Sequence, residues 1–185
     1  EEYIPEVQET RQAPMILQNP AIVVLSAKNQ ERLYEQVQRL LSALRTPEYA
    51  EASLEDIAFT LQVGREAMEE RLAVIAKSTT ELEGKLECFL AGNEEIDGLY
   101  SGQAKKNKDI LTVLEADEDM EQLVDIWISK GKYSKLAELW VQGLLFDWNR
   151  LYGKVRPHRM SLPTYPFAKE SYWISTFGSQ SKEVK

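Results

Sequence analysis

Two short runs of branched apolar residues separate longer stretches of helical spacing in the first hundred positions. The runs AIVVL at 21–25 and RLAVIA at 71–76 are mostly continuous rather than alternating, which is typical of strands buried on both faces. A shorter run at 96–100 predicts a third strand at the edge. We therefore expect a small three-stranded sheet.

Amphipathic helices are predicted between these strands. In the first, which Pro47 stops, the apolar positions recur at helical spacing and are Leu33, Val37, Leu40, Leu41 and Leu44. Ser53 and Thr80 each stand three residues before an acidic side chain, so both fit a capping box that opens a further helix. These two helices end near Gly64 and Gly92. The order β-α-α-β-α-β predicts an α+β fold, a sheet covered by helices.

Beyond residue 100 the pattern changes to two amphipathic helices and then an extended segment. The apolar spacing predicts helices over 120–128 and from Leu136 to near Asp147. After Tyr152, three prolines alternate with aromatic residues, so this tail is expected to lie extended across a folded surface. The resulting division is a linker at 1–19, a folded body at 20–145 and an extended tail at 146–185.

Charge and cysteine usage narrow the class of protein. The net charge is -8 and the isoelectric point about 4.9, which argue against nucleic acid or an anionic membrane as a partner. No apolar run is long enough to cross a membrane. Cys88 is the sole cysteine, so an internal disulfide is excluded and the reducing cytoplasm is the expected location.

The residues that usually carry catalysis are scarce. His158 is the sole histidine and stands in a proline-flanked, arginine-rich segment, which argues against a Ser-His-Asp or Cys-His machine. Cys88 has no basic neighbour to lower its pKa, and we expect a core thiol. One His and one Cys cannot supply a zinc site, and the glycines form no phosphate-binding motif. We expect no cofactor, no metal and no catalytic activity of the chain's own.

Two groups of segments resemble a known family. The first is VLSAKNQERLYEQ at 24–36, SLEDIAFTLQVGR at 53–65 and ERLAVIAK at 70–77. The second is LAELWVQGLLFDWNRLY at 136–152, followed by RMSLPTYPFAKESYWI at 159–174. They resemble, in this order, the linker that follows a ketosynthase domain in modular polyketide synthases and the segment that follows a built-in acyltransferase.

The interval between the two groups departs from synthases that contain their own acyltransferase. Such a domain needs several hundred residues and a G-H-S-x-G nucleophile elbow. Here the interval is residues 101–135, and the motif is missing. The chain is therefore similar to synthases served by an acyltransferase acting in trans, in which this region is described as a flanking subdomain or acyltransferase docking domain.

The resemblance implies partners and leaves three roles open. The partners are the adjacent ketosynthase, a free-standing acyltransferase and neighbouring copies of the synthase. The roles are a docking module for the acyltransferase, a structural spacer, or an element of lateral self-association. Partner contact or its support is predicted for Trp127, Leu139 and Trp140, although tryptophans at such spacing are also common in cores. Packing of the tail is predicted for Leu162, Pro163, Tyr165, Pro166, Phe167 and Trp173.

Overall fold

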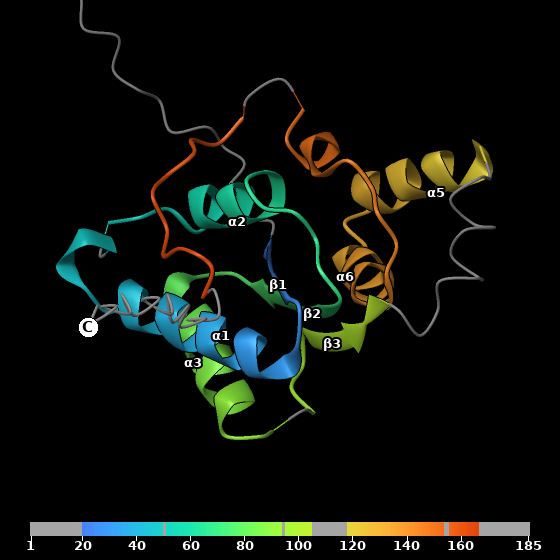
Figure 1. The fold of residues 1–185 in the computed structure, drawn as a ribbon. Coiled ribbons are helices and arrows are strands. Elements are labelled where there is room, and N and C mark those ends of the chain that lie inside the picture. Colours follow the sequence, from blue (N-terminus) through green and yellow to red (C-terminus); the bar gives the residue numbers. More distant parts are fainter. Residues whose placement is uncertain (1–19, 50, 94, 105–117, 154–155, 167–185) are drawn as a thin grey trace, which may run out of the picture.

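A computed structural model of the chain describes residues 20–49, 51–93, 95–104, 118–153 and 156–166. The elements are β1 (Ala21–Ala27), α1 (Gln30–Leu44), a 3-10 turn (Pro47–Tyr49), α2 (Leu54–Val63), β2 (Glu70–Ala76), α3 (Thr79–Leu90), β3 (Leu99–Gln103), α5 (Glu118–Ser129), α6 (Tyr133–Gln142) and a 3-10 helix (Trp148–Leu151). This is the predicted α+β fold, shown in Figure 1.

The sheet is antiparallel with strand order β1-β2-β3. Leu25 pairs with Leu72 of β2, and Leu72 pairs in turn with Ser101 of β3. The third strand begins later than the predicted run at 96–100, because the chain first turns. The Leu99 amide donates to the Ile96 carbonyl, and Gly98 between them has a φ of +75°, which favours glycine.

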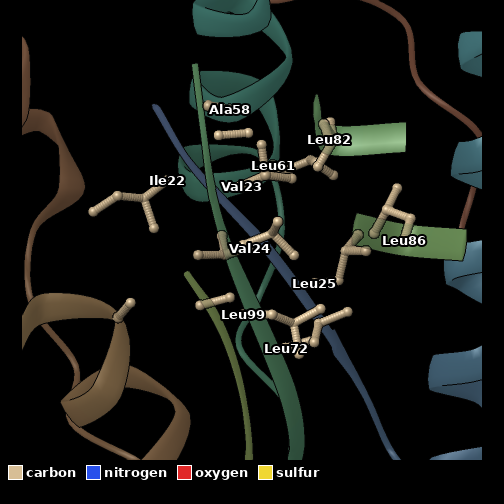
Figure 2. Close-up of a cluster of buried hydrophobic side chains, with 14 of the residues drawn as sticks. Ile22, Val23, Val24, Leu25, Ala58, Leu61, Leu72, Leu82, Leu86 and Leu99 are labelled. Carbon is tan, nitrogen blue, oxygen red and sulfur yellow. The ribbon is translucent and has the colours of Figure 1, made fainter. Parts of the chain in front are cut away.

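Helices cover both faces of the sheet, so the strands are buried on both sides (Figure 1). Helices α1 and α3 pack together on one face, and α6 lies against β2 and β3 on the other. Figure 2 shows Leu25 beside Leu86 of α3, whereas Ile22 points away from α3. This alternation follows the two-residue period of a strand, and both sets are apolar because both faces are covered.

The helix starts are set by side-chain caps, one of which differs from the prediction. Ser53 caps α2 as expected, with its hydroxyl accepting from the Asp56 amide at 3.2 Å. For α3 the capping residue is Ser78, which accepts from the Glu81 amide at 3.1 Å, and the prediction of Thr80 was wrong by two residues. Two overlapping Ser/Thr-x-x-Glu patterns compete here, and the earlier one is used.

Substitutions at Ser78 and Thr80 test which of these two residues caps α3. Ser78→Ala is expected to lower the free energy of unfolding by about 1 kcal/mol, because the Glu81 amide loses its acceptor. Thr80→Ala, at an exposed position inside the helix, should change it by less than about 0.5 kcal/mol. Chemical denaturation of the two variants measures the difference. Equal losses would contradict the cap assignment.

The C-terminal helices extend the body beyond the sheet. Helix α6 ends at Gly143, with φ +125°, rather than near Asp147, and Asp147 instead caps the 3-10 helix that follows. Trp148 in that helix is buried. Within the described ranges, no helix combines the length and the apolar character needed to cross a membrane.

Candidate interaction surfaces

The described part of the tail, residues 156–166, runs over the body and is called the strap here (orange to red in Figure 1). Side chains of the body bind its main chain. The Asp56 carboxylate accepts from the His158 amide at 2.7 Å, and the Thr60 hydroxyl accepts from the Met160 amide at 3.0 Å. The Tyr49 hydroxyl donates to the Ser161 carbonyl at 2.9 Å. Polar side chains of helix α2 and of the turn before it therefore hold the strap by hydrogen bonds to its main chain.

The second half of the strap lies toward the start of α1. Arg65 donates to the Pro163 carbonyl, and the Lys28 amide donates to the Tyr165 hydroxyl at 3.1 Å. Pro166 is fully buried, and Leu162 and Tyr165 pack against the main core. All four tail residues predicted to pack that the structure describes thus lie in or against the body. The remaining two, Phe167 and Trp173, lie outside the described residues.

Arg65 also reaches into the body, a feature that the sequence analysis missed. Gln36 is only 3% exposed, and the amide orientation that satisfies both neighbours donates to the Ser26 carbonyl at 2.8 Å and accepts from Arg65 at 2.7 Å. Burial lowers the pKa of Arg65, although an arginine remains charged throughout the ordinary pH range. One guanidinium therefore connects the end of β1, through Gln36, with the strap.

Further side chains engage the outer edge of β1. Gln62 of α2 donates to the Ile22 carbonyl at 2.7 Å and accepts from the Tyr152 hydroxyl at 2.6 Å. Burial raises the pKa of Tyr152, so the phenol stays protonated and can donate. Together with the contacts to Ser26 and Lys28 described above, side chains therefore bind main-chain groups at three even-numbered positions in β1 or just after it: Ile22, Ser26 and Lys28.

The tryptophan predicted to contact a partner from α6 is part of the core. Trp140 is 3% exposed, and its ring lies edge-on to that of Trp148 with centroids 6.1 Å apart. Arg71 of β2 stacks on the Trp140 ring at 5.0 Å and donates to the Trp140 carbonyl at 2.7 Å. Of the two roles open to Trp140, this placement leaves support of a surface rather than direct contact.

An apolar surface is exposed on α5, the outermost helix in Figure 1. Leu123 and Ile126 are 37% and 45% exposed, and they lie one helical turn apart. Trp127 is half-buried and packs against the main core, and Leu139 of α6 is half-buried as well. We call the exposed surface of α5 that Leu123 and Ile126 form the α5 face. Its position is held in part by Arg150, which pairs with Asp125 at 2.6 Å.

The described residues offer little for chemistry. They contain no group of three or more His, Cys, Asp and Glu side chains placed to bind a metal ion. His158 is exposed, and Cys88 is half-buried rather than the core thiol that was expected. A cavity beside Gln62, Trp140 and Trp148 has space of about 20 Å³, enough for roughly one water molecule. The site is therefore sought in the surfaces through which the described residues can contact other molecules.

Comparison with known proteins relates this fold to the linkers that flank the ketosynthase in polyketide synthases. Residues 24–93 match the family described as the RhiE-like, KS-MAT linker domain. The matched residues include the second half of β1 and all of α1, α2, β2 and α3. Over these residues the chain is therefore similar to this family of linkers.

Individual proteins similar to the chain agree with that class. Polyketide synthases PksL and PksM of Bacillus subtilis (strain 168) are 51% and 53% identical to it over 94% of its length. The chain spans only 4% of the length of either synthase.

Two solved structures contain a similar segment within a ketosynthase chain. The ketosynthase from module 6 of the bacillaene synthase of Bacillus subtilis 168 is 39% identical with a TM-score of 0.75, over 93% of this chain and 28% of that one. The ketosynthase from module 1 of the bacillaene synthase of Bacillus amyloliquefaciens FZB42 is 42% identical with a TM-score of 0.73, over 84% and 27%. In both, the matching segment belongs to the same polypeptide as the ketosynthase.

Proposed function

We propose that the chain is a non-catalytic docking and linker module of a trans-acyltransferase polyketide synthase in the cytoplasm. It packs on the adjacent ketosynthase and presents a surface to a free-standing acyltransferase. The observation that carries this proposal is the junction of β3 and α5, which are separated by residues 104–117 alone. A built-in acyltransferase of several hundred residues has no place in so short a connection, which supports supply of the acyl group by a separate protein.

The α5 face is the surface that we assign to partner binding. Leu123 and Ile126 place exposed apolar area among charged and polar side chains, as interface cores with polar rims do. Trp127 and Leu139 lie half-buried nearby on α5 and α6, and Trp140 supports α6 from the core. A partner that covers this face would remove apolar area from water, which favours association.

A titration of the ketosynthase-attached chain with the free-standing acyltransferase tests this assignment. Ile126→Asp is expected to weaken binding by about tenfold or more, because a carboxylate would be buried in an apolar contact. Gln38→Asp adds the same charge at an exposed position of α1, away from the α5 face, and should change the affinity by less than about threefold. Failure to bind even with the ketosynthase attached would contradict the proposal, as would equal losses in both variants.

Two other roles have a specific observation in their favour. The same exposed Leu123 and Ile126 would suit lateral contact between copies of the synthase. In that case Ile126→Asp would abolish a dimer seen by light scattering and leave acyltransferase binding unchanged. The bonded strap would suit a structural spacer, in which the module sets the distance between the ketosynthase and the next domain.

A further inference from the structure

The hydrogen bonds that hold the strap mostly join side chains of the body to main-chain groups of the strap. Those to His158, Met160, Ser161 and Pro163 are made to amides or carbonyls of the strap, while the body contributes side chains. The strap's own side chains take part through Tyr165, which bonds to a body amide, and through burial of Pro166. Binding of main-chain groups by fixed side chains is how a protein recognises an extended peptide with little dependence on its sequence.

We propose that Tyr49, Asp56, Thr60 and Arg65 form a peptide-binding surface and that the strap is its non-covalent ligand. The strap then stays bound after the covalent connection to the body is cut. Because the bonded groups belong to the main chain, the surface fixes the register of the peptide, and the burial of Pro166 anchors its C-terminal end. This inference is independent of acyltransferase docking, since it concerns a different face of the body.

Arg65 is the positioning residue of that surface. Its guanidinium is the charged donor to the Pro163 carbonyl, and charge-assisted hydrogen bonds are stronger than neutral ones. The other guanidinium nitrogen of Arg65 donates to Gln36, which in turn donates to the Ser26 carbonyl. These bonds within the body orient Arg65 toward the strap independently of the strap itself. Lysine carries the same charge but lacks the planar fork, and it cannot bond Gln36 and Pro163 in the same geometry.

Cleavage between body and strap tests the proposal. A protease site inserted after Gly153 allows the folded full chain to be cut in place. We expect the C-terminal fragment to stay with the body on size exclusion at micromolar concentration. Arg65→Ala should raise the dissociation constant of the fragment roughly tenfold or more, since one charge-assisted bond is lost. Thr164→Ala, at an exposed strap position, should leave it unchanged. Immediate separation of the unsubstituted fragment would overturn the proposal.

Methylation of single amides distinguishes main-chain recognition from side-chain packing. Synthetic peptides of residues 156–166 are used to displace the labelled C-terminal fragment from the cut, unsubstituted chain. N-methylation at Met160 removes the donor to Thr60 and should weaken competition by about fivefold or more. N-methylation at Arg159, between the two bonded amides, should weaken it much less. Equal effects would overturn main-chain recognition, and this comparison remains decisive if Arg65→Ala does not fold.

Discussion

Replacing Arg71 by methionine is expected to lower the free energy of unfolding by about 3 kcal/mol, and thereby the melting temperature by roughly 6–12 °C. Arg71 is 4% exposed and donates to the carbonyls of Met68 at 2.9 Å, Trp140 at 2.7 Å and Leu144 at 3.4 Å. The Trp140 carbonyl lies in the last turn of α6 and the Leu144 carbonyl just after it, where a cation is also favoured by the helix dipole. Methionine preserves most of the volume and removes the guanidinium from all three carbonyls, of which the Trp140 carbonyl keeps the Gly143 amide at 3.0 Å.

A surface arginine provides the control for this result. Arg45 pairs with Glu83 and Glu87, but its side chain is half exposed, and Arg45→Met should change the stability by less than about 1 kcal/mol. Urea denaturation followed by tryptophan fluorescence measures both variants. A loss below about 1 kcal/mol for Arg71→Met would show that the guanidinium is not what joins α6 to the sheet.

Gly102→Ala should be the second most damaging of the substitutions considered, with an expected loss of about 2–3 kcal/mol. A Cβ atom at Gly102 would lie 2.6 Å from the Val141 carbonyl oxygen and 3.1 Å from its carbon, both of which are backbone atoms. Helix α6 must therefore move away from β3, and the packing of its Trp140 in the core must loosen. Hydrogen exchange of the α6 amides, compared with those of α1, measures whether the damage is confined to this contact.

The matched control for that substitution is another glycine. Gly84 lies inside α3, where an added Cβ meets nothing within 4 Å. Gly84→Ala should raise the stability by up to about 1 kcal/mol, because alanine has the higher helix propensity. Opposite signs for the two Gly→Ala changes are thus expected in the same denaturation experiment. A neutral Gly102→Ala would contradict the close approach of α6 to the sheet.

The fold was predictable because its apolar patterns are simple. The branched runs at 21–25 and 71–76 became β1 and β2, and all five apolar positions predicted for the first helix are buried in α1. The boundaries were less predictable where two local signals compete. Ser78 and Thr80 both satisfy the capping pattern, so the pattern alone does not tell which of them caps α3. Similarly, the turn at Gly98 delays β3 beyond the predicted run.

The surfaces were predictable in part. The tail's aromatic and proline content indicated an extended segment over the body, and Tyr165 and Pro166 do lie against it. The residues that receive the strap were missed, because single polar side chains on a helix usually face water. A signal existed for Gln36, which stands three residues after Leu33 and four before Leu40, within the buried stripe of α1. For Trp140 the prediction of partner contact or its support met a residue buried in the core, since sequence spacing does not separate a core tryptophan from one at an interface.

The side chains bound along the outer edge of β1 have a consequence for how copies of this fold coexist. An unoccupied strand edge is a template on which a strand from another molecule can add. Here Gln62, Gln36 and Tyr165 already bond Ile22, Ser26 and Lys28. Growth of a cross-molecular sheet from β1 would require these bonds to break first. When many copies are crowded together, strand addition at the β1 edge is therefore suppressed.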